Sequence, residues 1–200
     1  MKALKISFYV LLIVALGLMG MSVVFAPQGF PEGSKTDQRA ALHDYSVRSE
    51  SIALRDDSRS TQANKDVPAK AGRELNGLVF FPDLAPAQEQ QFPLVIYSHG
   101  FSSSHKGGEY LGRYLAGLGF IVAMVDFPLT NMYAKGGPFV QDVVNQPADV
   151  SFLIDTLLNR SRLKGDTLNG LIDGKRIGVM GVSLGGFTSP LFSFHPTMGD

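Results

Sequence analysis

Residues 176–186 read RIGVMGVSLGG, a short apolar run that leads into a glycine-rich turn. A buried strand, covered on both faces, is predicted by the apolar residues Ile177, Val179, Met180 and Val182. The turn fits the pattern G-x-S-x-G, which holds a serine in a strained conformation with its side chain exposed. Glycine is needed on both sides of Ser183 because larger side chains would collide with the turn. We therefore predict that Ser183 is a nucleophile, at which the next helix points its free N–H groups.

Composition limits the classes of protein to which the chain can belong. Its 200 residues have zero formal net charge and are 44% hydrophobic, which is typical of a globular domain. The sequence contains no basic block, so nucleic acid is not expected as a partner. The absence of cysteine excludes disulfides, a thiolate nucleophile and a cysteine-based zinc site.

The first 26 residues have the layout of a targeting segment. Lys2 and Lys5 precede an uncharged run over residues 6–26. That run fits a cleaved signal peptide and is also long enough for a retained anchor that would associate with a membrane. In both cases we expect the rest of the chain to be exported, into the periplasm or out of the cell. Residues 27–45 predict a linker, in which His43 is expected to be a solvated surface residue, and residues 46–200 predict one domain.

Strands and helices alternate along this domain. Strands are predicted over residues 46–55, 75–81, 93–98 and 120–125, and helices over residues 109–118 and 146–160. The first two strands are expected to form an antiparallel pair at a sheet edge, and the later ones to be parallel. Ligands bind at the carboxyl ends of parallel strands, which are here marked by Ser98, Asp126 and Ser183. The fold class is α/β, with a mostly parallel sheet and helices on both faces.

A second glycine-containing loop, SHGFSS at residues 98–103, follows the third strand. In folds with this elbow, an oxyanion hole takes one backbone N–H from that loop and one from the residue after the nucleophile. The predicted donors are the N–H groups of Phe101 and Leu184. Gly100 would let the backbone come close to a substrate. We expect His99 to hold the loop by side-chain hydrogen bonds, and His105 to face solvent or the rim of the site.

Four stretches of the chain resemble the bacterial predicted dienelactone hydrolases, which are close to platelet-activating-factor acetylhydrolases within the α/β-hydrolase superfamily. The shared features are strands ending in Ser-His-Gly and Asp-x-Pro, a Pro-x-Asp-Val helix start and the elbow, within residues 92–104, 120–128, 146–158 and 175–186. The resemblance implies an α/β-hydrolase fold and a serine enzyme that cleaves a small-molecule or lipid ester without a metal or cofactor. Ser183 matches its nucleophile, and Phe101 and Leu184 match its oxyanion donors. Val182 departs from the family, whose members often carry histidine there.

The acid and the histidine of a serine triad should follow Ser183 in this family. His195 and Asp200 are the only histidine and acidic residues after it, and His195 is expected on the far side of the sheet from the hydroxyl. The family's acid follows a sixth strand and its histidine follows the last strand, neither of which the sequence predicts. We therefore expect an incomplete hydrolase domain, truncated after the elbow helix and inactive as given.

Three functions remain open at this point. The first is an exported serine hydrolase that cleaves carboxylic esters through an acyl-enzyme on Ser183. The second is a lactone hydrolase of the dienelactone type, although that class often uses a cysteine nucleophile. The third is a non-catalytic binding protein with a degenerate hydrolase fold. The loop over residues 127–146 contains Phe127, Met132, Tyr133 and Phe139. These residues fit two interpretations equally well: they line an apolar substrate pocket, or they pack on the core.

Overall fold

The computed structural model describes residues 12, 14–17, 19, 32–35, 44–84 and 90–194. The chain divides into two compact units, Met1–Leu42 and His43–Asp200. Most of the predicted targeting segment and linker, together with His43, lies outside the described residues. Among the residues that are described, no helix has the length and apolar character needed to cross a membrane.

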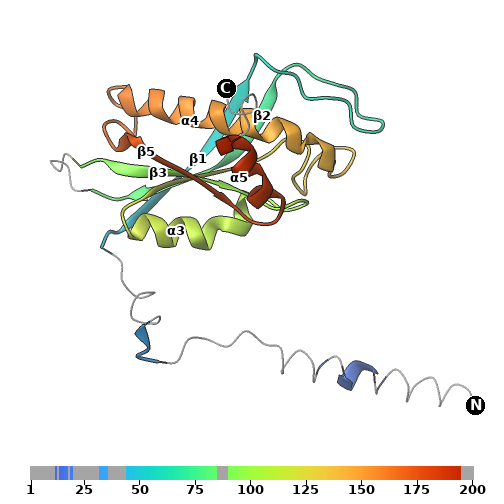
Figure 1. Ribbon diagram of the computed structural model, residues 1–200, viewed down its shortest axis with the longest axis horizontal. Coiled ribbons are helices and arrows are strands. Elements are labelled where there is room, and N and C mark those ends of the chain that lie inside the picture. Colours follow the sequence, from blue (N-terminus) through green and yellow to red (C-terminus); the bar gives the residue numbers. More distant parts are fainter. Residues whose placement is uncertain are drawn as a thin grey trace, which may run out of the picture. The chain divides into compact units, whose positions relative to one another are not determined.

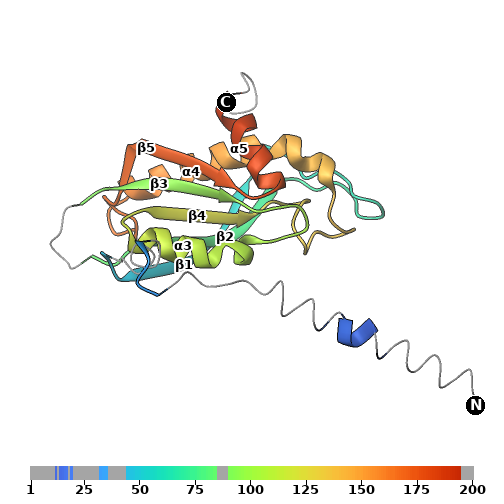
Figure 2. The same ribbon diagram turned by 60° about the horizontal axis from the view of Figure 1, so that its bottom comes forward.

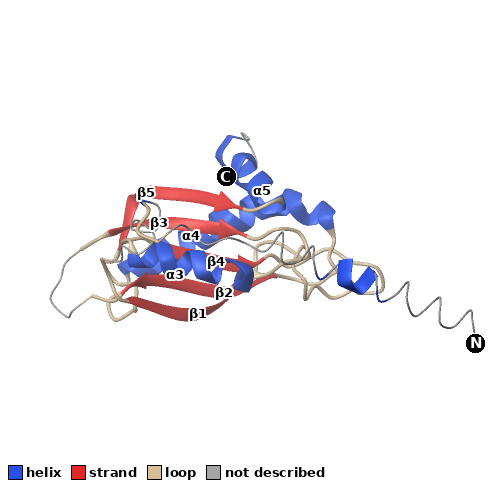
Figure 3. Cartoon of the chain, turned by 90° about the horizontal axis from the view of Figure 1, so that it is seen from below, coloured by secondary structure: helices blue, strands red, loops and turns tan. Residues whose placement is uncertain are grey.

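The second unit is built on a five-stranded sheet in the order β1-β2-β4-β3-β5 (Figure 3). The strands are β1 (Val47–Asp56), β2 (Arg73–Pro82), β3 (Phe92–Ser98), β4 (Ile121–Asp126) and β5 (Ile172–Gly181). The expected antiparallel pair of β1 and β2 at one edge is confirmed. The sheet is mixed: of the described strands, β1, β3, β4 and β5 run in the same direction, and β2 runs against them. Because β2 lies between β1 and β4 and runs against both, two of the four pairings are antiparallel, whereas β3 pairs in parallel with β4 and β5.

Helices cover both faces of the sheet, as expected (Figures 1 and 2). Helix α3 (Glu109–Gly117) packs on one face, where Phe80, Tyr97 and Met124 form a small buried cluster. Helices α4 (Gln146–Arg162) and α5 (Leu184–Phe194) cover the other face. Two short 3-10 helices, η1 (His105–Gly108) and η2 (Val140–Asn145), precede α3 and α4.

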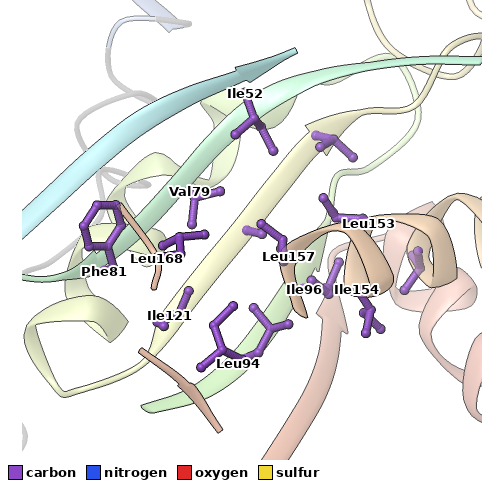
Figure 4. Close-up of a cluster of buried hydrophobic side chains, with 14 of the residues drawn as sticks. Ile52, Val79, Phe81, Leu94, Ile96, Ile121, Leu153, Ile154, Leu157 and Leu168 are labelled. Carbon is purple, nitrogen blue, oxygen red and sulfur yellow. The ribbon is translucent and has the colours of Figure 1, made fainter. Parts of the chain in front are cut away.

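The larger core lies between the sheet and α4 (Figure 4). Leu94 and Ile96 of β3 face Leu153 and Leu157 of α4, and all four side chains are fully buried. Val95 and Tyr97 point to the opposite cluster under α3, because successive side chains of a strand alternate between its two faces. The apolar run of β3 is therefore covered on both faces, as its sequence predicts.

Strand β5 does not fit the buried strand predicted from its sequence. It is last in the sheet order and pairs only with β3 among the described residues. Ile177 is 38% exposed, Val182 just beyond the strand is 52% exposed, and Val179 and Met180 are half-buried. An apolar run therefore identified the strand correctly but not its surroundings, because burial depends on the neighbours that the strand acquires.

Candidate active site

The strained serine predicted at the elbow is present between β5 and α5. Ser183 has a φ of 52°, in the left-handed region that costs a side-chain-bearing residue free energy. The residue is exposed. A strained, exposed serine at the carboxyl end of a strand is the arrangement that the G-x-S-x-G pattern predicts.

The two glycines of the pattern are required by close backbone contacts. A Cβ atom on Gly181 would lie 2.3 Å from the carbonyl carbon and oxygen of Gly185. A Cβ atom on Gly185 would lie 2.0 Å from the carbonyl oxygen of Ser98. Backbone atoms cannot move aside as the end of a flexible side chain can. The structure thus bears out the steric reason for glycine at both positions.

The loop after β3 lies directly against this elbow. The N–H of Val182 donates to the carbonyl oxygen of Ser98 at 3.2 Å. A Cβ atom on Gly100 would lie 3.4 Å from the Cβ atom of Ser183 and 3.3 Å from the carbonyl oxygen of Val182. The two stretches, about 80 residues apart in sequence, therefore meet at one rim of the sheet, as predicted from the parallel pairing of β3 and β5.

The backbone groups predicted as oxyanion donors belong to the two segments that meet here. Phe101 follows Gly100 and is 43% exposed, and Leu184 is the first residue of α5. Within the described part of the chain, the N–H groups of Phe101 and Leu184 donate to no backbone or side-chain acceptor. Their role as oxyanion donors remains a prediction.

His99 has the structural role that the sequence favours. Its side chain is buried, with 1% of the residue exposed. Nε2 accepts a hydrogen bond from the N–H of Phe127 at 3.1 Å, so Nδ1 carries the proton and donates to the carbonyl oxygen of Gly100 at 2.8 Å. Burial lowers the pKa of His99, which favours this neutral ring. Nε2 thus joins the loop after β3 to the loop after β4, whereas Nδ1 makes a hydrogen bond within the loop after β3.

Of the two places expected for His105, solvent and the rim, the structure shows the rim: the side chain lies against Asp126 at the end of β4 and is 14% exposed. The His105 backbone N–H donates to Asp126 Oδ1 at 2.7 Å, and ring Nδ1 lies 2.9 Å from the same oxygen. Asp126 ends β4, so it anchors the start of η1 to the neighbouring strand. Sequence reasoning placed Asp126 at this rim without assigning its partner.

The loop that follows β4 divides between core and surface. Phe127 is fully buried and packs against the His99 ring, whereas Met132 and Tyr133 are 53% and 59% exposed. Phe139 is half-buried. A cavity of about 500 Å³ lies between this loop and the long β1–β2 connection, and Tyr133 is among its lining residues. Phe127 therefore packs on the core, whereas Tyr133 lines a cavity, so each of the two interpretations of the loop fits a different residue.

The remaining candidates for the triad are the histidine and the acidic residue that follow Ser183 in the sequence. His195 and Asp200 lie beyond residue 194, outside the described residues. Among the residues that are described, the Ser183 hydroxyl has no hydrogen-bond partner. In the same part of the chain, no group of three or more His, Asp or Glu side chains is arranged to hold a metal ion.

The mixed sheet, the strained serine turn and the helix that follows it define an α/β protein with the geometry of a nucleophile elbow. No known family model matches the sequence, and no curated protein matches it. The fold is similar to that of a solved ferulic acid esterase from Streptomyces cinnamoneus, with 23% identity and a TM-score of 0.51. The match covers 76% of this chain and 56% of the esterase, so the chain spans about half the length of that protein. At this identity the likeness establishes a shared fold.

Proposed function

We propose that this chain belongs to a serine hydrolase that cleaves carboxylic esters through an acyl-enzyme on Ser183. One observation carries the proposal. Ser183 is exposed at a φ of 52°, between two glycines whose positions leave no room for a side chain. Strain of this kind persists only where the surrounding structure enforces it, and it is concentrated at functional sites. The fold shared with an esterase agrees with this chemistry.

In the proposed reaction, Ser183 Oγ attacks the ester carbonyl carbon, and a general base takes the hydroxyl proton. The carbonyl oxygen becomes an oxyanion, which the N–H groups of Phe101 and Leu184 stabilise. The carbon–oxygen bond then breaks, and the alcohol leaves with the proton. Water, activated by the same base, attacks the acyl-enzyme and releases the acid. The residue that acts as this base is not among those that the structure describes.

The proposal extends to the compartment and the narrower family. We place the enzyme outside the cytoplasm because two lysines precede the uncharged run over residues 6–26. The likeness to dienelactone hydrolases and platelet-activating-factor acetylhydrolases rests on the sequence motifs.

An active-site-directed probe tests the proposed nucleophile. We expect the complete gene product to react with a fluorophosphonate and to carry the adduct on the peptide that contains Ser183, as read by mass spectrometry. Ser102 is the matched internal control, because it too has a positive φ, 55°, and is exposed, but it has a glycine on one side only, with Gly100 two residues before it and Ser104 two residues after it. A folded protein that is not labelled, or is labelled at Ser102, would contradict the proposal and would favour a non-catalytic binding protein.

The contact between Gly100 and the elbow predicts a second effect. Replacing Gly100 with valine should lower kcat for a short p-nitrophenyl ester roughly 100-fold, the cost of displacing one oxyanion donor. The added side chain would press on Val182 and Ser183, because even a Cβ atom is within 3.4 Å of both. Steady-state kinetics on protein with an unchanged circular-dichroism spectrum measures this effect. A folded variant with unchanged kcat would remove this loop from the mechanism.

A further inference from the structure

A buried amide joins the two halves of the predicted oxyanion hole. Gln146, the first residue of α4, is fully buried. Its Nε2 donates to Thr130 Oγ1 at 2.7 Å, and its Oε1 accepts a hydrogen bond from Thr188 Oγ1. Thr130 and Thr188 are also fully buried. A chain of three hydrogen-bonded side chains therefore links the loop after β4, the start of α4 and helix α5.

Each end of this chain leads to one predicted oxyanion donor. The carbonyl oxygen of Thr130 accepts the N–H of Ser102 at 2.9 Å, and Ser102 is bonded through its own backbone to Phe101. Thr188 lies one helical turn after Leu184, and its Oγ1 is also 3.1 Å from the carbonyl oxygen of Leu184. Gln146 thus lies between the segment that carries the Phe101 N–H and the segment that carries the Leu184 N–H.

The backbone at the first of these ends needs such support. Ser102 has a φ of 55°, a conformation that a residue with a side chain keeps only when its surroundings enforce it. The loop after β3 forms two backbone hydrogen bonds with the loop after β4, to which Gln146 is bonded through Thr130. Ser102 donates to Thr130, and Met132 donates to the carbonyl oxygen of Ser103 at 2.8 Å. Thr130 is therefore in direct hydrogen-bond contact with the residue beside Phe101.

We propose that Gln146 is a positioning residue that sets the separation of the Phe101 and Leu184 N–H groups, an inference that rests on the proposed hydrolase function. An amide suits this task because it presents a donor and an acceptor on one rigid plane, matched here to two hydroxyl groups. The two N–H groups can bind one oxyanion only at a fixed separation, and a displacement of about 1 Å can cost about 100-fold in rate. Gln146 itself touches no reacting atom in this scheme.

The test compares Gln146→Met with Gln146→Glu in the complete gene product. Methionine has a similar length but pairs with neither hydroxyl. Glutamate keeps the acceptor for Thr188 and, when ionised, loses the donor to Thr130. We expect both to lower kcat for a p-nitrophenyl ester by about 10- to 100-fold with KM changed less than about threefold, since the lost stabilisation belongs to the transition state. Thr156→Val is the matched control, because Thr156 is on the same helix and its hydroxyl donates to Phe152.

A pair of variants at Thr130 keeps the test decisive if the glutamine variants fail to fold. Thr130→Ser retains the hydroxyl and should keep kcat within about twofold, whereas the isosteric Thr130→Val should lose about tenfold or more. A merely structural role would instead lower the melting temperature of both glutamine variants while leaving kcat of the folded fraction unchanged. That result, or equal kcat for Thr130→Ser and Thr130→Val, overturns the inference.

The two proposals fail in different ways. If Ser183 is neither labelled by the probe nor needed for turnover, the hydrolase proposal fails, whatever Gln146 does. If turnover depends on Ser183 but kcat is unchanged in a folded Gln146→Met protein, only the positioning role fails.

Discussion

Replacing Ser183 with alanine is expected to lower kcat for p-nitrophenyl acetate by about 10⁴- to 10⁶-fold, the loss that follows removal of a triad nucleophile. The effect should be this large because the elbow presents a single hydroxyl at the strained position. Gly181 and Gly185, at which a Cβ atom would collide with the backbone, carry no side chain that could replace it. Steady-state hydrolysis by the complete gene product and by the variant measures the ratio.

Ser193→Ala is the matched control for this experiment. Ser193 is an exposed serine on α5, the helix that begins next to Ser183, so its loss removes a hydroxyl without touching the turn. Its kcat should stay within about twofold of the wild-type value, as is usual for a surface substitution away from the site. Turnover that survives in Ser183→Ala would show that another group performs the chemistry, and the assignment of the elbow would be wrong.

Backbone features of this site were predictable from sequence because each has a local cause. Gly181 and Gly185 are required by contacts within the turn itself, or between the turn and the adjacent strand. Gly119 directly follows the helix predicted over residues 109–118 and has a φ of 89°, which glycine adopts without strain. Such features depend on few residues at fixed spacing, and the pattern G-x-S-x-G records that spacing.

Features that depend on distant partners were not predictable in the same way. The sequence marked Gln146 only as the start of a helix, yet its amide bonds Thr130 and Thr188, which are 16 and 42 residues away. Likewise, β5 was identified as a strand, but its exposure follows from its place at the end of the sheet order. Hydrophobic periodicity reports local structure and says nothing about which elements pack together.

A buried arginine is the clearest such omission. Arg73 opens β2, is 1% exposed and donates to two carboxylates about 70 residues further along the chain. Asp149 accepts its Nε and Nη2 at 2.7 Å each, and Asp142 accepts Nη1 at 3.2 Å and Nη2 at 2.9 Å. Although burial alone would lower the pKa of Arg73, these bonds raise it, so the guanidinium remains charged. In the sequence, Asp149 was marked only as part of the Pro-x-Asp-Val motif at a helix start.

Replacing Arg73 with methionine is therefore expected to lower the free energy of unfolding by about 3–5 kcal/mol, the usual cost of removing one partner from a buried ion pair. Asp142 and Asp149 are fully buried, and among the partners that the structure describes, Asp149 would keep only the bond from Arg59 at 2.7 Å. The methionine side chain supplies similar bulk, so the loss of stability arises from the uncompensated charge of the two carboxylates more than from a cavity. Urea unfolding monitored by circular dichroism gives the two free energies.

Arg176→Met provides the comparison, since Arg176 is also a strand arginine paired with an aspartate. Its Nε lies 2.6 Å from Asp173 Oδ2, but its side chain is 56% exposed, so solvent screens the pair. We expect that variant to lose less than about 1 kcal/mol. Equal losses in the two variants would mean that burial does not set the strength of the Arg73 contacts. A loss below about 1 kcal/mol for Arg73→Met would show that β2, η2 and α4 hold together without the ion pair.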